Sequence, residues 1–501
     1  MTRQRTILPA LLFALAWSGC SKKNPAGPPA DVRREFYVSP SGDNGNAGTA
    51  EKPWASIQYA VGRLAAGDAL VLLKGTYEVT EMIRVSLKGK EGAWFTIRGE
   101  SGQAVTLDGT KADIPSGSRY PYNNGILQIE NASFVRIQNL TVRNSHRAGI
   151  NIQDSDHIDV LNCTSRNSLC PGISAWQGCS NIRVLGNTVI NANDMSMSWT
   201  PYTGSEAPHE AISMAGPQFF EVAYNHVQNC RKEGIDIKET SAHGEVHHNH
   251  VHNCSRQGLY IDGWFGVLED VDIFDNVVHG CEAGIAVSSE DGPDTKDLSI
   301  HHNLVYDNRA TGIFFSRWGK DNPRENVRVF NNTFYRNGWG PNFSGDPNYW
   351  LSGGCYLYST HIKDLTLRNN IFAKDKPFEI GYTEGYGGIP DSEKNIVVDH
   401  NLVFDVNTVQ YPFYMATWAK DWVHVTVGDS AVEADPLFLN PAAGDFRIQA
   451  GSPAIDAGNP GAEYDDPDGT RSDIGAFPSA ATEADLWWKS DFPPIIDPAS
   501  L

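Results

Sequence analysis

A short phrase that returns along most of the chain is the strongest constraint on its fold. The letters GIDIK at Gly234 return as GLYID at Gly258, and EVHHN at Glu245 returns as DIFDN at Asp272. A repeat of this size cannot bury its apolar side chains alone, so successive copies have to stack into one continuous core. The repeat therefore predicts a single elongated solenoid, although a length of 501 residues would otherwise suggest several domains.

Asparagine and glycine mark two corners of the predicted coils. Asparagine tolerates the left-handed backbone of a tight turn, and stacked copies can bond to one another along a column. We therefore predict an all-β fold, a parallel β-helix of roughly 10–12 coils, in which Asn225, Asn249, Asn276 and Asn303 form a ladder at one corner. The recurring residues are Asn139, Asn162, Asn187, Asn225, Asn249, Asn276, Asn303, Asn332, Asn370, Asn401, and Gly149, Gly172, Gly234, Gly258, Gly284, Gly312.

The first 20 residues have the layout of an export signal. Two arginines precede an apolar run, Ile7–Trp17, that is too short to span a bilayer as a mature helix, and Cys20 ends the segment. The segment resembles a bacterial lipoprotein signal, which implies that Cys20 is acylated and becomes the new N-terminus. Residues 21–35 are a polar, Pro-rich tether. We expect an exported lipoprotein of the periplasm, outer membrane or cell surface, held at the membrane by its lipid anchor only.

The two ends of the solenoid have sequences of their own. Residues 36–110 indicate a cap and the first coils, with an amphipathic helix at Ser56–Leu64 that would plug the open end. Residues 111–430 are the repeats, and residues 431–501 are a closing segment that caps the last coil. The opening, FYVSPSGDNGNAGTAEKPW, resembles the N-terminal module of secreted right-handed parallel β-helix proteins with a pectin-lyase-like fold, including polysaccharide lyase family 9.

Alternation along two adjacent strands brings ionisable groups together. Every second residue of GIDIK and GLYID is apolar and points inward, so Asp236, Lys238, Tyr260 and Asp262 share the outer face of one sheet. Neighbouring coils lie about 4.8 Å apart, which should place Lys238 and Asp262 within ion-pair reach. Glu290 has the same outward parity one coil later, with its Cα roughly 8 Å from that of Asp262. Two such carboxyl groups can flank a glycosidic bond, although a structural ion-pair ladder is the alternative.

Two family resemblances meet at these strands. EGIDIK and QGLYID resemble the catalytic strands of polysaccharide lyase family 9, which implies that Lys238 abstracts the proton α to a uronate carboxylate. That family also holds calcium with aspartates, whereas residues 255–257 of this chain are SRQ. The same strands resemble the β-helical β-xylosidases of glycoside hydrolase family 120, which implies that Asp262 is the nucleophile. The acid/base glutamate of that family falls at Ser288, two residues before Glu290.

Further residues are expected to line a groove on this face. The insertion Asp194–Pro208 lies where solenoids often carry binding loops, and the two residues after it align with Lys232 and Glu233 one coil later. Aromatic side chains offer flat faces for sugar rings, although each alone could equally be packing. The expected substrate-binding residues are His209, Glu210, Glu233, Tyr260, Trp264, Trp176, Arg317 and Trp318.

Cysteines and histidines are not expected to carry chemistry. Cys230, Cys254 and Cys281 recur at one place in successive coils, which permits one disulfide or a buried thiol column. The histidine cluster should point in several directions, which favours a stacked polar rung over a metal site. No cofactor is expected; calcium has candidate ligands only in an acidic turn of the closing segment that is more simply solvated. The histidines are His243, His247, His248, His250 and His252, and the acidic residues are Asp465, Asp466 and Asp468.

These observations predict an exported, monomeric enzyme that degrades a polysaccharide or oligosaccharide. The net charge of -20 disfavours nucleic acid as a partner. The preferred prediction is a glycoside hydrolase with Asp262 and Glu290 as catalytic carboxyls and Lys238 and Asp236 as neighbours that set their pKa values. A polysaccharide lyase with Lys238 as base is the first alternative, but nearby carboxylates raise a lysine pKa and oppose that role. A non-catalytic glycan-binding surface lipoprotein is the second.

Overall fold

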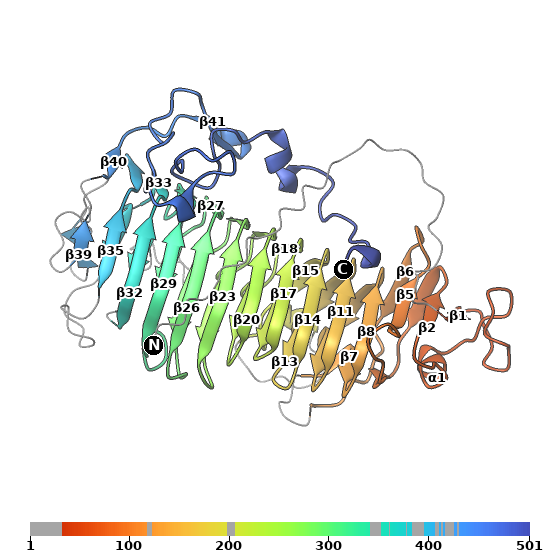
Figure 1. Cartoon of the computed structure of the whole chain (residues 1–501). Helices are drawn as coiled ribbons and strands as arrows, with labels where there is room; N and C mark the ends of the chain where they lie inside the picture. Colours follow the sequence, from red (N-terminus) through yellow and green to blue (C-terminus); the bar gives the residue numbers. More distant parts are fainter. Residues whose placement is uncertain are drawn as a thin grey trace, which may run out of the picture.

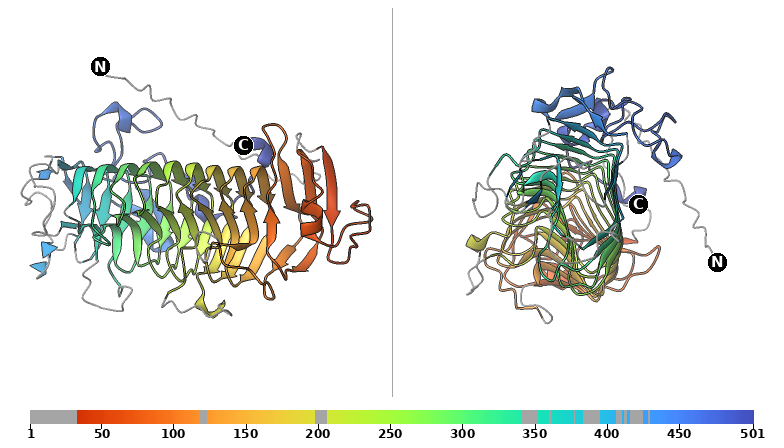
Figure 2. Two further views of the ribbon diagram at one scale, coloured as in Figure 1. Left: turned by 90° about the horizontal axis from the view of Figure 1, so that it is seen from below. Right: turned by 90° about the vertical axis from the view of Figure 1, so that its left-hand side faces the viewer.

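The computed structural model describes residues 33–501 except 118–122, 198–205, 341–351, 360, 377, 383–394, 406–409, 412–413, 416–424 and 428–429. The described chain winds into an elongated parallel β-helix with three sheets of 14, 13 and 13 strands, which confirms the predicted fold class (Figures 1 and 2). The export signal, Cys20 and the tether up to residue 32 lie outside the described residues. In the part of the chain that is described, no helix has the length and apolar character needed to cross a membrane.

Each coil contributes one strand to each sheet in turn. The first sheet contains β1 (Arg34–Val38), β2 (Asp68–Leu72), β5 (Phe95–Gly99), β8 (Ser133–Gln138), β11 (Asp156–Leu161), β14 (Ser180–Leu185), β17 (Gln218–Ala223), β20 (Ala242–His247), β23 (Leu268–Phe274), β26 (Thr295–His301), β29 (Arg324–Phe330), β32 (Ile362–Arg368), β35 (Ile396–Asp399) and β39 (Val425–Val427). The second sheet contains β3 (Gly75–Glu78), β6 (Val105–Asp108), β9 (Thr141–Ser145), β12 (Thr164–Ser168), β15 (Thr188–Ala192), β18 (His226–Gln228), β21 (His250–His252), β24 (Val277–His279), β27 (Leu304–Tyr306), β30 (Thr333–Tyr335), β33 (Ile371–Ala373), β36 (Leu402–Phe404) and β40 (Val432–Glu433).

The third sheet carries the candidate site. It contains β4 (Ile83–Val85), β7 (Gly125–Glu130), β10 (Ala148–Gln153), β13 (Ile173–Trp176), β16 (Ile212–Ala215), β19 (Ile235–Lys238), β22 (Leu259–Gly263), β25 (Ala283–Ser289), β28 (Thr311–Phe315), β31 (Gly353–Leu357), β34 (Ile380–Tyr382), β37 (Gln410–Tyr411) and β38 (Tyr414–Met415). The apolar residues of GIDIK and GLYID point into the common core, as predicted: Ile235, Ile237, Leu259 and Ile261 are at most 2% exposed.

The asparagine ladder runs along the corner between the first and second sheets, as predicted. The Oδ1 of Asn249 accepts hydrogen bonds from the backbone N–H and the side-chain amide of Asn225, both at 3.0 Å. The same pair of bonds links each later asparagine, so the ladder extends from Asn187 to Asn401. Two members were predicted wrongly. Asn187 lies beside Cys163, so Asn162, like Asn139 a coil earlier, precedes the column by one residue.

The left-handed residue of each turn is therefore the one before the ladder. His248 and Asp275, which precede ladder asparagines, have φ of 50° and 52°. Glycine at the second corner has a steric reason, because a Cβ on Gly234 would lie 2.4 Å from Val251 Cγ1 and 2.6 Å from the Gly258 carbonyl oxygen. The predicted cysteine column is one of buried free thiols.

The N-terminal end of the solenoid is covered by a short helix. Helix α1 (Ile57–Val61) begins after Ser56, whose Oγ accepts a hydrogen bond from the N–H of Tyr59, and it ends at Gly62, before the predicted Leu64. Its buried side chains join the end of the core. The closing segment contains the hairpin β41 (Phe438–Asn440) and β42 (Asp445–Ile448). Single 3-10 turns are η1 (Met195–Met197), η4 (Pro441–Ala443), η5 (Ala462–Tyr464), η6 (Glu483–Asp485), η7 (Trp487–Lys489) and η8 (Pro498–Ser500).

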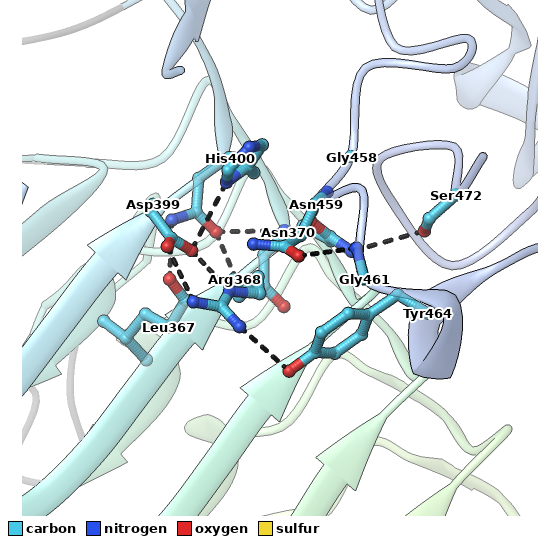
Figure 3. A network of polar contacts seen from close by, with 12 residues as sticks. Leu367, Arg368, Asn370, Asp399, His400, Gly458, Asn459, Gly461, Tyr464 and Ser472 are labelled. Atoms are coloured by element: carbon cyan, nitrogen blue, oxygen red, sulfur yellow. Dashed lines mark hydrogen bonds and ion pairs between the residues drawn. The ribbon is translucent and has the colours of Figure 1, made fainter. Parts of the chain in front are cut away.

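The closing segment lies along the side of the solenoid, against the outer face of the second sheet, and not at the last coil as predicted. Arg368 of β32 donates to Asp399 at 2.5 and 2.7 Å and to the Tyr464 hydroxyl at 3.1 Å (Figure 3). The segment then runs back along the solenoid to β11, where the Ile496 N–H donates to Asn162 Oδ1 at 2.8 Å (Figure 1). The displaced Asn162 thus binds the tail.

Candidate active site

Strands β19, β22 and β25 pair in the register that the corner glycines predict. Asp236 lies beside Tyr260, Lys238 beside Asp262, and Asp262 beside Ser288. These side chains are on the outer face of the third sheet, yet Asp236 is fully buried and Asp262 is 2% exposed. Side chains from the neighbouring corner and loops therefore cover the face, and the charges lie in a medium where solvation is weak.

Lys238 is the central cation of this cluster. Its Nζ lies 3.3 Å from Glu210 Oε1 and 3.6 Å from Asp236 Oδ2. The predicted ion pair with Asp262 is wrong, because no pair between them lies within 4.0 Å in the described residues; Nζ instead turns toward the carboxylate that reaches over from the corner. Burial lowers the pKa of Lys238. Nearby negative charges have the larger, opposite effect and raise this pKa well above 10.5; they come from Glu210, Asp236, Asp262 and Glu239.

A row of charges along the corner forms one wall of the site. The predicted alignment of Glu210 with Glu233 is confirmed by the pairing of β16 and β19. Lys232 lies 3.6 Å from Glu210 and 3.7 Å from Glu233, and Arg256 binds Glu233 at 3.2 Å. Arg256 also pairs with Glu206, so the described end of the insertion adjoins this wall, whereas residues 198–205 of the insertion lie outside the described residues. Burial raises the pKa of Glu210, but its lysine neighbours reverse the shift and leave it lowered.

Two carboxyl groups of the site have too few donors. Both oxygens of Asp236 and the Oδ1 of Asp262 are buried without a hydrogen-bond partner. Burial raises the pKa of Asp236, and the charge of Glu210 adds to the shift. Burial also raises the pKa of Asp262, opposed by the charge of Lys238 and reinforced by that of Glu290. Lys238 alone cannot neutralise both Asp236 and Asp262, so burial favours a protonated form of this pair.

Glu290 lies just beyond the end of β25. Its N–H donates to the Gly263 carbonyl at 2.9 Å, and its Oε1 accepts a 2.5 Å hydrogen bond from the Tyr260 hydroxyl. Burial raises the pKa of Glu290, and the bond from Tyr260 partly opposes this shift. The structure thus brings Glu290 into the same cluster as Asp262, on the adjacent coil.

Glu239 is a site residue that sequence reasoning missed. Strand parity would point it inward, but β19 ends at Lys238 and Glu239 has φ of 63°, which turns the chain. Its side chain is 6% exposed and accepts a hydrogen bond from the backbone N–H of Phe265. Burial raises the pKa of Glu239 to about 7, partly opposed by Lys238. Its signal in the sequence was its place directly after the charged strand.

The predicted aromatic platforms divide into packed and partly exposed rings. Trp176 and Tyr260 are only 3% and 6% exposed, so they pack. The Trp176 Nε1 donates to Asn151 at 2.7 Å, and its ring meets His209 edge-on at 4.6 Å. Burial lowers the pKa of His209 to about 4, so this wall residue is neutral.

Residues of the next coil close the other side. The Trp318 ring meets Tyr260 edge-on at 5.6 Å and is half-buried. Arg317 lies 5.3 Å over the Tyr358 ring and 3.5 Å from Asp321. Trp264 is half-buried too, with its ring 6.4 Å from that of Phe265. Of the predicted rings, Trp264 and Trp318 therefore retain surface for a ligand.

The predicted histidine cluster separates onto two sheets. His243 is exposed and bonds to Asp270 at 2.7 Å on the first sheet, where His247 also lies, and His248 is in the turn that follows. His250 and His252 belong to the second sheet and stack on other histidines, as the stacked-rung interpretation predicts. None of these five residues belongs to the carboxylate cluster.

A hollow of about 740 Å³ lies on the outer face of the first sheet. Aromatic rings line it together with charged groups, and Phe219 is 56% exposed. The rings of Phe134 and His157 stack at 4.3 Å. Exposed rings beside polar groups suit glycan binding, so this hollow is a second surface of interest.

Two family models match the chain. Residues 36–208 match a model described as "Pel9A-like, right handed beta helix region", and residues 124–296 match one described as "Right handed beta helix region". The chain is a right-handed parallel β-helix protein. The Pel9A-like match ends before Glu210 and so covers the cap and early coils of this β-helix protein, whereas the second match includes the carboxylate cluster.

Two curated relatives resemble this β-helix protein. It is 28% identical over 467 residues to "Uncharacterized protein YwoF" of Bacillus subtilis, which covers 84% of this chain and 92% of the relative. It is 32% identical over 162 residues to pectate lyase PEL9 of Emericella nidulans, which covers 31% of this chain and 39% of that enzyme. A carbohydrate-active enzyme is thus among the relatives.

Solved structures of similar shape carry several functions in their names. XylC in complex with xylose has a TM-score of 0.49 at 13% identity, covering 81% of this chain and 87% of its own. Pectate lyase Pel9A has a TM-score of 0.47 at 13% identity, covering 89% and 96%. PfbA, a surface adhesin of Streptococcus pneumoniae, has a TM-score of 0.44 at 12% identity, covering 70% and 84%. At these identities the likeness concerns the fold.

Proposed function

We propose that this β-helix protein is an enzyme that hydrolyses glycosidic bonds in a polysaccharide or oligosaccharide, with Asp262 and Glu290 as its catalytic carboxyl pair. The observation that carries the proposal is a buried cluster in which several carboxyl groups share too few cations and donors. Such a cluster retains protons near neutral pH. Glycoside hydrolysis needs a protonated carboxyl that donates to the leaving oxygen and an ionised one on the other side of the bond.

The surroundings support different roles for the members of the cluster. Glu290 is half-buried at the end of β25, where it can reach a ligand, and the Tyr260 hydroxyl fixes its orientation. Asp262 is more deeply buried beneath it and keeps an unpartnered oxygen. Lys238 remains protonated beside Glu210 and Asp236, so it stabilises negative charge and positions groups. Glu239, whose pKa is raised by burial to about 7, is an additional group that could donate a proton.

A polysaccharide lyase is the second candidate, favoured by the sequence similarity to pectate lyase PEL9. In that mechanism Lys238 would have to be neutral to accept a proton from the sugar ring. The carboxylates around it raise its pKa and oppose that role. The third candidate is glycan binding without catalysis, for which the aromatic hollow on the first sheet is the supporting observation.

A panel of plant, algal and host glycans distinguishes the three candidates. The purified protein is incubated with each glycan, and both reducing ends and ultraviolet absorbance are recorded. A hydrolase releases reducing ends without absorbance, whereas a lyase produces an unsaturated uronide that absorbs. A glycan that retards the protein in affinity electrophoresis, with neither product, indicates a binder. Absorbing product from any substrate would overturn the hydrolase proposal.

Export by a lipid anchor is part of the proposal. The cluster Ser18-Gly19-Cys20 follows an apolar run typical of an export signal. In a bacterial host, wild-type protein should take up labelled fatty acid and sediment with membranes, and Cys20→Ala should do neither. Membrane association that survives Cys20→Ala would contradict acylation at this residue.

A further inference from the structure

Four histidines come together on the outer face of the second sheet, a different sheet from the one that carries the carboxylates. β18, β21 and β24 pair so that His226 lies beside His250, and His252 lies beside His279. Alternate residues of these strands, such as Val251 at 0% exposure, enter the core, so the imidazoles all point outward. Three successive coils therefore supply the cluster.

The four rings form two stacked columns that face each other. His226 stacks on His250 with centroids 5.1 Å apart and planes 1° from parallel, and His252 stacks on His279 at 5.0 Å and 4°. Across the columns, the Nε2 atoms of His226 and His252 are 2.9 Å apart, and those of His250 and His279 are 3.0 Å apart. One ring nitrogen from each of His226, His250 and His252 lies within 4.8 Å of the other two.

Aromatic side chains surround the four imidazoles. Phe492 of the closing segment has its ring 6.1 Å from His226 and 6.3 Å from His250, and Tyr306 stacks on His279 at 4.8 Å. All four histidines are half-buried. Within the described residues none of them pairs with a carboxylate, so their ring nitrogens face one another and not an anion.

The geometry of the cluster suits neutral imidazoles. The facing Nε2 atoms lie at hydrogen-bond distance, so in each pair one ring donates and the other accepts. Neutral imidazole is the form that binds metal ions, because a protonated ring has no free lone pair.

We propose that His226, His250, His252 and His279 form a binding site for one first-row transition-metal ion of the Zn²⁺ type. A tetrahedral ion with metal–nitrogen bonds of about 2.0–2.1 Å holds its ligands roughly 3.4 Å apart. Binding therefore requires the facing nitrogens, now 2.9 and 3.0 Å apart, to separate slightly and the stacked rings to bring their nitrogens closer. The ion replaces the single hydrogen that each facing Nε2 pair now shares, while the ring hydrogens move to Nδ1.

The donor set determines the class of ion. Imidazole nitrogen suits zinc, copper and nickel, whereas calcium and magnesium prefer oxygen ligands. Four imidazoles without a carboxylate select against those two harder ions. The aromatic shell of Phe492 and Tyr306 limits the access of water and strengthens binding.

Occupancy would join three coils and anchor the closing segment. His226, His250 and His279 come from consecutive strands of the second sheet, so an ion bound to all of them ties those strands through their side chains. Phe492 lies directly against the cluster. The site is therefore structural, and it is independent of the proposed hydrolysis.

The test uses full-length protein purified without a histidine tag and stripped with a chelator. Zn²⁺ is titrated by calorimetry, and Co²⁺ is titrated while the visible spectrum is recorded. Wild type should bind one Zn²⁺ per chain, give the intense d–d bands of tetrahedral Co²⁺, and show a higher Tm with Zn²⁺. His252→Gln should weaken Zn²⁺ binding by about 100-fold or more. Removing a residue that only hydrogen-bonds to a metal ligand already lowers metal affinity by about 10–100-fold, and removing the ligand itself should lower it at least as much.

His243→Gln is the matched control, because this exposed histidine pairs with Asp270 on another sheet. It should bind Zn²⁺ like wild type. His279→Gln is a second ligand variant in case His252→Gln does not fold, as judged by circular dichroism. Absence of stoichiometric binding to wild type, octahedral Co²⁺ spectra, or equal weakening in His243→Gln would each overturn the proposal.

Discussion

The outer faces of the second and third sheets both stack titratable side chains on adjacent coils, with opposite consequences. On the second sheet, His226 and His252 face each other at 2.9 Å, since a neutral imidazole is donor and acceptor at once. On the third sheet, Asp236 and Asp262 keep buried oxygens without partners, since a carboxyl group offers at most one hydrogen to donate and the donors around it are few. Stacking like residues on successive coils is therefore favourable when they can hydrogen-bond to one another. When they cannot, buried polar atoms are left without partners.

This difference separates two kinds of candidate site. The imidazole columns need no ligand to be stable, in the same way as the asparagine ladder at the corner. The carboxylate cluster depends on Lys238 and on bound protons, because leaving buried charges unpaired is costly. Buried carboxyl groups with perturbed pKa values are found most often at sites where they take part in chemistry. The comparison therefore supports catalysis on the third sheet.

The largest effect is expected from removing the cation of the carboxylate cluster. Lys238→Ala should lower the free energy of unfolding by about 3 kcal/mol or more, because Glu210 and Asp236 lose their buried partner. Lys238→Arg should retain part of both stability and activity by keeping the charge. In metal-free protein, His252→Gln should cost only about 1 kcal/mol. Urea denaturation measures all three, and equal losses for Lys238→Ala and His252→Gln would refute the comparison.

The next effect concerns turnover. Asp262→Asn and Glu290→Gln should each reduce kcat by about 100-fold or more on a substrate found in the glycan panel, since general acid and base groups contribute about that much. Circular dichroism should show both variants folded. Glu269→Gln is the matched control, because Glu269 pairs with Lys296 on the outer face of the first sheet, away from the carboxylate cluster. Full activity in either carboxyl variant would remove that residue from the catalytic pair.

Most of the fold was predictable because its determinants are local and repeated. Gly234 and Gly258 sit where a Cβ would collide with the next coil, so counting from them gave the register of Lys238 with Asp262. The recurrence of asparagine misplaced Asn162, because a one-residue shift in the early coils moves it off the ladder. Registers transfer from coil to coil only while coil geometry is unchanged.

Side-chain destinations were harder to predict than registers. Lys238 turns to Glu210 and not to Asp262, because the corner residue reaches over the strand, and strand pairing contains no information on that rotamer. Glu239 was missed because its positive φ ends the alternation. His226 could have been found, since it follows its ladder asparagine by one residue, as His250 does.

The last effect concerns the pH dependence of stability, which distinguishes Glu239 from its neighbours. Its pKa is raised by burial from 4.5 to about 7, so between these values the folded protein binds a proton that the unfolded chain has released. Stability from this group is complete below pH 4.5 and is lost as the pH rises toward 7, at up to about 1.4 kcal/mol per pH unit. Glu239→Gln cannot release a proton, so its unfolding free energy should fall less steeply than that of wild type between pH 5 and 7.

Glu269→Gln should follow wild type, because that carboxylate lies on the outside of the first sheet. Urea denaturation at pH 5, 6, 7 and 8 measures the slopes. Parallel curves for Glu239→Gln and wild type would mean that Glu239 is ionised throughout, and its role as a proton donor would then pass to Asp262 or Glu290.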